Sequence, residues 1–182
     1  MDIMNRISFI TSIIASIIAS IFFITSCATL TQDIKVEIHA DSGADFSTFK
    51  SYAWASSEQI VFDPIGQWEQ PTLNTDKEVK FNINQELRAK GLFETQDNPD
   101  LLVTFSAGVD MTHMELKQNP DSPKNVLTNA PKAALVIALI DTRTGYTVWL
   151  GFAEGDVQPQ QTIENIRARI DYAVSKILKA YK

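Results

Sequence analysis

Hydrophobic and polar positions alternate in short, strand-like segments after residue 32. Ile34, Val36 and Ile38 alternate with charged or polar neighbours, which is the period of a strand with one exposed face. Further strands are predicted at residues 51–55, 101–109, 133–140 and 147–154. The third of these is apolar almost throughout, as expected for a central strand covered on both faces.

Two helices are predicted from apolar residues at helical spacing. Thr75 and Glu78 have the spacing of a capping box, so the first helix is expected to begin at Thr75 and to end at Gly91. The second helix has one continuous apolar face, made of Ile163, Ile166, Ile170, Val174, Ile177, Leu178 and Tyr181. Gly145 is expected to take a positive φ in the turn between the last two strands.

In order, these segments predict an α+β domain with the element sequence β-β-α-β-β-β-α. We expect a mostly antiparallel sheet of about five strands with two helices packed on it. Two loops interrupt the pattern, at residues 56–74 and 115–132, and three prolines lie in the second.

The N-terminal stretch is the most hydrophobic part of the chain. Residues 7–25 carry no charge, and an apolar run of this length that ends at small residues is typical of a signal peptide. A membrane helix that is not removed is the alternative, because about 20 apolar residues span a bilayer. We expect residues 1–26 to be a signal peptide, residues 27–32 a short tether and residues 33–182 a single domain.

The only cysteine, Cys27, closes the run Ile24-Thr25-Ser26-Cys27 at the end of this stretch. The run resembles the lipobox of bacterial lipoproteins. This resemblance implies removal of the signal peptide, lipid on Cys27 and attachment to a membrane of the cell envelope by two or more acyl chains. Ala28 follows the cysteine, and the resemblance then implies the periplasmic face of the outer membrane.

The net charge of −6 bears on the partners of the domain. An acidic domain repels nucleic-acid phosphates and anionic lipid head groups, so we expect no nucleic acid as a partner and a membrane contact made by the lipid on Cys27. The chain contains no Gly-x-Ser-x-Gly, His-Glu-x-x-His or phosphate-binding glycine motif. We therefore expect no catalytic residues and no cofactor, with a hydrolase site assembled from distant residues as an alternative.

Two groups of residues are candidates for binding. Met111, His113 and Met114 offer thioether and imidazole ligands that suit copper(I). Strand alternation would, however, turn Met114 away from the other two. The other candidate is the loop at 56–74, in which Phe62 and Trp68 either cover the core or bind an envelope protein, a lipid or a small apolar ligand.

Several motifs occur together in a recognisable order. They are Asp45-Phe46-Ser47-Thr48-Phe49-Lys50-Ser51-Tyr52-Ala53-Trp54, Leu87-Arg88-Ala89-Lys90-Gly91-Leu92, Asn98-Pro99-Asp100-Leu101-Leu102-Val103, and Asp141 followed by Val148-Trp149-Leu150-Gly151-Phe152-Ala153. In this order behind a lipobox, they resemble the domain-of-unknown-function family 4136. The family often has a basic residue where this chain has Leu150. The resemblance implies a small envelope lipoprotein and its fold, and it implies no activity.

Overall fold

The computed structural model describes residues 30–55, 60–62, 73–110, 113–118, 125–158 and 161–181. Residues 33–182 form one unit, and the following description concerns this unit. Of the residues singled out above, Cys27, Trp68 and Met111 lie outside the described residues. The same is true of the side chain of Phe62.

The unit contains two helices and nine strands among its described residues. The helices are α2 (Thr75–Ala89) and α3 (Ile163–Lys179), and a short 3-10 turn covers Phe46–Thr48. The strands are β1 (Lys35–Ala40), β2 (Ser51–Trp54), β3 (Ile60–Phe62), β4 (Phe93–Glu94), β5 (Leu101–Asp110), β6 (Met114–Gln118), β7 (Asn125–Asn129), β8 (Lys132–Asp141) and β9 (Thr147–Asp156).

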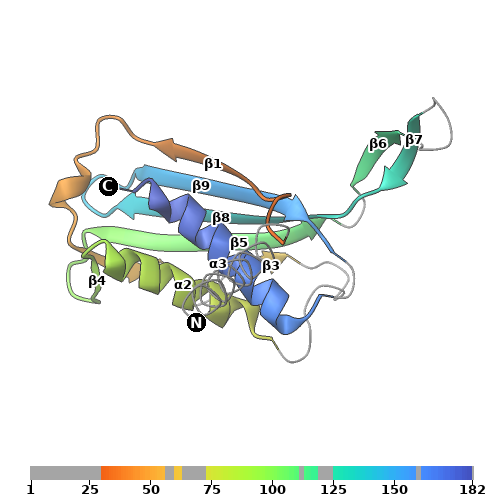
Figure 1. Ribbon diagram of the computed structural model, residues 1–182. Helices are drawn as coiled ribbons and strands as arrows, with labels where there is room; N and C mark the ends of the chain where they lie inside the picture. Colours follow the sequence, from red (N-terminus) through yellow and green to blue (C-terminus); the bar gives the residue numbers. More distant parts are fainter. Residues whose placement is uncertain are drawn as a thin grey trace, which may run out of the picture. The chain divides into compact units, whose positions relative to one another are not determined.

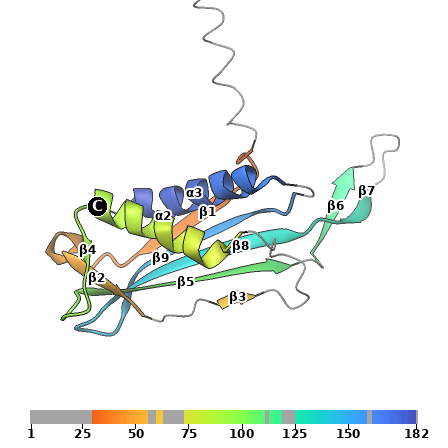
Figure 2. The same cartoon turned by 90° about the horizontal axis from the view of Figure 1, so that it is seen from below.

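Seven of these strands form one sheet in the order β1-β9-β8-β5-β2-β4, with β3 also paired to β5. β1, β9, β8 and β5 pair antiparallel, whereas β2 and β3 run parallel to β5 and β4 runs parallel to β2. Both helices lie on one face of this sheet (Figures 1 and 2). β6 and β7 form a separate two-stranded ribbon that extends beyond the end of the sheet (Figure 1).

The core lies between the helices and the sheet because the strands alternate buried and less buried residues. In β5 the buried side chains are those of Leu101, Val103, Phe105, Ala107 and Val109. The helices face them with their apolar stripes, including Val79, Ile83 and Leu87 of α2 and Val174, Ile177 and Leu178 of α3. Alternation in the sequence thus decides which face of the sheet the helices cover.

Much of the predicted architecture is confirmed. The fold is α+β, with two helices on a mostly antiparallel sheet. The final helix occupies the predicted position. Gly91 and Gly145 have φ values of 85° and 75°, as expected for a helix end and a tight turn.

Other predictions need correction. The sheet has more strands than the predicted five, because β3 and β4 join it through only three and two residues. Such short pairings leave no recognisable pattern in the sequence. The expected loop at 115–132 contains the ribbon β6–β7. Asn74, not Thr75, caps α2, since its side chain accepts a hydrogen bond from the N–H of Lys77.

β8 also differs from its prediction as a strand covered on both faces. Leu135, Ile137 and Leu139 are buried under the helices, but Val136 and Ala138 on the other face are only partly buried. No described helix covers that second face. β8 thus has one fully buried face and one partly buried face, although nearly all of its residues are apolar.

Candidate functional site

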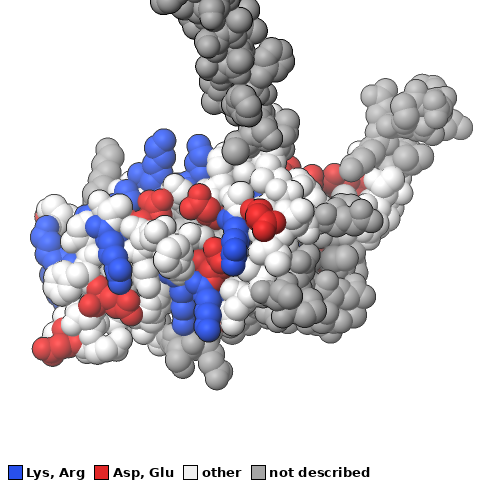
Figure 3. All heavy atoms as spheres, turned by 60° about the horizontal axis from the view of Figure 1, so that its bottom comes forward, with Lys and Arg blue, Asp and Glu red and all other residues white. Residues whose placement is uncertain are grey.

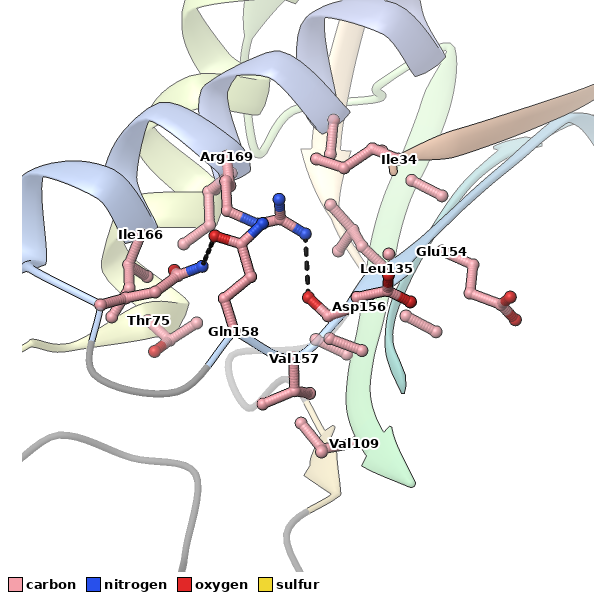
Figure 4. A pocket seen from close by; sticks show the side chains of 18 of the residues that line it. Ile34, Thr75, Val109, Leu135, Glu154, Asp156, Val157, Gln158, Ile166 and Arg169 are labelled. Atoms are coloured by element: carbon pink, nitrogen blue, oxygen red, sulfur yellow. Dashed lines mark hydrogen bonds between the residues drawn. The ribbon is translucent and has the colours of Figure 1, made fainter. Parts of the chain in front are cut away.

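A pocket of about 310 Å³ opens between the helices and the sheet. Its walls come from the first half of α3, the start of α2, the ends of β5 and β9, and the start of β8. Figure 4 shows that Ile166 and Arg169 of α3 lie opposite Leu135 and Glu154 of the sheet across this space. All of its lining residues belong to the unit formed by residues 33–182.

The pocket exists because small side chains meet at its floor. Ala107 on β5, Ala153 on β9 and Ala173 on α3 are all at least nine-tenths buried. Ala107 and Ala153 lie on either side of Leu135 in the sheet, and Ala173 belongs to the helix that covers them. Because an alanine ends at Cβ, these three positions leave space that leucines would fill. Val79 and Leu135 complete the floor with branched apolar side chains.

The opposite end of the core is filled by large side chains. Phe46, Phe49, Trp149 and Tyr181 form an aromatic cluster with edge-to-face ring contacts, at centroid distances between 5.2 and 6.0 Å. Such contacts fill volume and add about 0.5–1.5 kcal/mol per pair beyond area burial. The core is therefore tightly filled at its aromatic end and open at its alanine end.

An ion pair closes one side of the pocket rim. Arg169 donates from Nη1 and Nη2 to the two carboxylate oxygens of Asp33, at 2.7 and 2.6 Å, and Nη2 also donates to the carbonyl oxygen of Asp156 at 3.0 Å. The hydrogen bonds from Arg169 hold the pKa of Asp33 below its ordinary value, although partial burial opposes this shift. The carboxylate of Asp33 is therefore charged at neutral pH.

A second ion pair lies beside the rim. Lys132 contacts Glu115 and Asp156 at 2.6 Å each. The hydrogen bonds from Asp156 and Glu115 raise the pKa of Lys132 further above its already high ordinary value. Gln161 donates to Gln158 at 2.9 Å, also at the rim. The charged groups named at the rim thus have protein partners, and the floor is apolar.

This arrangement is suited to holding an apolar molecule. Burial of apolar surface contributes about 25 cal/mol per Å², and a pocket near 300 Å³ is at the small end of the range for ligand sites. The lining is mostly apolar, and its polar members include Thr75, Glu154, Asp156 and Arg169. The apolar floor supports binding by shape and burial.

Neither His113 nor Met114, the two candidates whose side chains the structure describes, lines this pocket. The described part of β3 includes the backbone of Phe62, which pairs with Gly108 of β5. His113 approaches Glu115, with its Nε2 atom 3.8 Å from the carboxylate, while the Sδ atom of Met114 lies 4.0 Å from the amide of Asn129. His113 and Met114 thus have separate neighbours.

Two further observations concern metals and membranes. The described residues contain no group of three or more His, Cys, Asp or Glu side chains arranged to hold a metal ion. No helix within those residues has both the length and the apolar character needed to span a bilayer. Over the helical layer, basic and acidic side chains are interspersed (Figure 3).

The sequence analysis missed the pocket residues. A signal was present in the apolar positions that face the core, where the strands and the last helix change from large residues to alanine. Along β5 the inward series ends in Phe105, Ala107 and Val109, and along β9 Trp149 is followed by Gly151 and Ala153. Ala107 and Ala153 lie on either side of Leu135 in the sheet, and they mark a cavity only if the facing helix residue is also small, which depends on the tertiary structure.

Several solved structures are similar to this one. A DUF4136 family protein from Bacteroides thetaiotaomicron VPI-5482 is 16% identical, with a TM-score of 0.54, and the match covers 81% of this chain and 95% of that protein. A PDZ domain protein from Parabacteroides distasonis ATCC 8503 is 18% identical, with a TM-score of 0.49; the match covers 82% of this chain but only 36% of that protein.

A dodecameric protein, PelC from Paraburkholderia phytofirmans, is 14% identical, with a TM-score of 0.46. That match covers 79% of this chain and 96% of PelC. No curated protein matches the sequence. The model of the family described as "Domain of unknown function (DUF4136)" matches residues 36–181. This range runs from β1 past the end of α3 and includes nearly the whole pocket, so the chain belongs to the DUF4136 family.

Proposed function

We propose that this protein is a lipid-anchored, non-catalytic binding domain of the bacterial cell envelope, and that it holds a small apolar ligand in the pocket between α3 and the sheet. The observation that carries the proposal is the convergence of Ala107, Ala153 and Ala173 on one apolar floor. A space of this size inside a core loses packing energy. An apolar ligand would restore that energy.

Ligand binding is tested by adding the apolar fluorophore N-phenyl-1-naphthylamine to the mature chain with the substitution Cys27→Ser. We expect saturable binding of one fluorophore per chain. Ala107→Leu and Ala173→Leu fill the floor and should each weaken binding by at least about tenfold, or about 1.4 kcal/mol. Ala138→Leu is the matched control, because it makes the same change on the other face of the sheet, away from the pocket.

Lipid anchoring through Cys27 is supported and tested independently of ligand binding. The run Ile24-Thr25-Ser26-Cys27 behind an uncharged stretch supports acylation of Cys27. Mass spectrometry of the purified native chain should give an N-terminus at Cys27 carrying diacylglycerol and a third acyl chain. The Cys27→Ser variant should lack this mass and leave the membrane fraction. A native chain with a free thiol and residues 1–26 still attached would contradict the proposal.

Binding of an envelope protein is the second candidate function, and exposed apolar residues on the ribbon β6–β7 favour it. Leu116 and Leu127 are paired across the two strands, with 70% and 61% of their surfaces exposed. The loop residues Phe62 and Trp68 belong to the same hypothesis. Photocrosslinking in cells from positions 62, 68 and 116 should then capture one defined partner, and Trp68→Ala should abolish its co-purification without unfolding the domain.

A further inference from the structure

We infer that the ligand of this pocket is a single hydrocarbon chain of a membrane lipid, taken from the bilayer to which the protein is anchored. This inference rests on the proposed function and specifies the class of the ligand and its source. Three observations lead to it. They are the place where the chain enters the domain, the size of the pocket and the pairing of the charges at its rim.

The polypeptide enters the domain at the rim of the pocket. Ile34, immediately before β1, lines the pocket, and Asp33 is held there by Arg169, which also lines it. The N–H of Asp156 donates a further hydrogen bond to Asp33 at 2.7 Å. Two elements of the domain therefore fix the point at which the tether begins.

The tether is short. Five residues lie between Cys27 and Asp33, and an extended chain gains at most about 3.5 Å per residue, so Cys27 stays within about 20 Å of Asp33. This reach is comparable to one leaflet of a bilayer, whose hydrocarbon core is about 30 Å thick. A lipid on Cys27 would therefore keep the rim beside the membrane surface, where acyl chains are the most abundant apolar molecules.

The size of the pocket fits one chain. A cavity of about 150 Å³ holds one benzene ring of six carbons. The pocket here has about 310 Å³, so it accommodates roughly twelve methylene-sized groups. Affinity for single-chain lipids should accordingly rise by about fourfold per methylene up to this length, and it should level off when further carbons remain outside the pocket.

The charges at the rim favour recognition of the chain over the head group. Arg169 is engaged by Asp33, and Lys132 by Glu115 and Asp156. An anionic head group would have to displace these carboxylates, which already form short ion pairs. The pocket should therefore bind chains of zwitterionic and anionic lipids within a factor of about three.

The test uses the lipidated mature protein, beginning at Cys27, in vesicles of phosphatidylethanolamine and phosphatidylglycerol. These vesicles contain a phospholipid with a diazirine on one acyl chain. After illumination and digestion, mass spectrometry locates the crosslinks. We expect them at the floor, in the peptides that contain Leu135 and Ala173. The variant Ala173→Leu should lower this labelling by at least about tenfold, and Ala138→Leu should leave it unchanged. Ala107→Leu repeats the test from another element if circular dichroism shows that the first variant is unfolded.

The source of the lipid is tested by moving the photoreactive phospholipid into separate vesicles without protein. Labelling should then be lost. Equal labelling in the two arrangements would overturn the inference that the lipid comes from the anchoring membrane. Labelling confined to Ile34 and the outer surface would overturn the inference that a chain enters the pocket. If the acyl chains attached to Cys27 occupied the pocket and excluded the photoreactive phospholipid, the inference that a membrane lipid chain enters the pocket would be overturned as well.

Failure of this inference is distinguishable from failure of the proposed function. If the floor binds N-phenyl-1-naphthylamine and the two leucine variants weaken that binding, the pocket is a ligand site even when no phospholipid enters it. If neither the fluorophore nor the phospholipid reaches the floor, the proposed function is wrong too.

Discussion

Gly151 in β9 allows α3 to pack closely on the sheet. A Cβ atom at this position would overlap the Cγ2 atom of Ile177 in α3. Gly155, on the same strand, has a related role, because a Cβ atom there would lie 2.7 Å from Nη2 of Arg169 and 3.1 Å from the carboxylate of Asp33. One glycine thus permits the contact between helix and strand, and the other leaves space for the ion pair at the pocket rim.

Gly151→Ala should therefore destabilise the domain. Overpacking of a filled core typically costs about 1–3 kcal/mol, and Ile177 is fully buried, so it has no free space to enter. Urea denaturation of the two proteins measures this difference. Gly43→Ala is the control, since a Cβ atom there would meet only Asp41 at 3.4 Å. Its effect should stay within about 0.5 kcal/mol, and equal effects of the two changes would contradict the explanation.

The hydroxyl groups of two buried tyrosines, Tyr52 and Tyr181, differ in their hydrogen bonding. The hydroxyl of Tyr52 donates to Asn84 at 2.8 Å, whereas that of Tyr181 has no hydrogen-bond partner within the described part of the chain. Burial raises the pKa of Tyr181 to about 12, so its hydroxyl stays neutral. Tyr52→Phe should cost about 1 kcal/mol of unfolding free energy. Tyr181→Phe should be neutral or stabilising, and a larger loss for Tyr181→Phe would show that its hydroxyl is bonded.

At the scale of elements, the long periodic segments were predictable and the short ones were not. α3 contains six of the seven apolar residues predicted for its buried face, and the side chain of Thr162 caps it by accepting a hydrogen bond from the N–H of Asn165. Its local sequence therefore agrees with its packing. β4 and the three residues of β3 have no such pattern. They become strands because β2 and β5 offer free edges, which is a tertiary effect.

The ribbon β6–β7 gives a prediction at this scale. Among the described strands, β6 and β7 pair only with each other, and a two-stranded ribbon contributes little stability by itself. Asp110 and Lys132 are paired at the end of the sheet, so replacing residues 111–131 with Asn-Gly should close a two-residue turn there. We expect the melting temperature to change by no more than about 5 °C.

The control for this replacement is Ile137→Ala in the adjoining strand β8. Ile137 is fully buried, and its truncation should cost about 2–5 kcal/mol. If removal of the ribbon destabilises the domain as much as this core change does, then the ribbon belongs to the folding unit.

At the scale of the whole molecule, the sequence predicted one α+β domain but not its pocket. The candidates Phe62, Trp68 and His113 were selected because their side chains are large and aromatic or can bind a metal. The pocket depends instead on alanines, and a single alanine in a sequence gives no indication of a binding site. Ala107 and Ala173 are more than sixty positions apart, and only the folded arrangement of β5 and α3 brings them together.

The ion pair of Asp33 and Arg169 joins the start of the domain to its last helix and should make stability depend on pH. The pKa of Asp33 is lowered from 3.8 by folding, so its contribution is complete only well above pH 3.8 and is lost as the pH falls through the lower folded value. The difference in unfolding free energy between the native protein and Asp33→Asn should therefore shrink from neutral pH to about pH 3. Urea titrations at the two pH values check this, and an unchanged difference would contradict it.

The pairing of β1 with β9 bears on when the domain can fold. Lys35 pairs with Glu154, and α3 packs on both of these strands. A ribosome or a secretion channel that delivers the chain from its N-terminus therefore releases β1 long before β9, its neighbour among the described strands of the sheet. Contacts so distant in sequence form late and slowly. The sheet can therefore be completed at its β1 edge only after almost the whole chain has emerged.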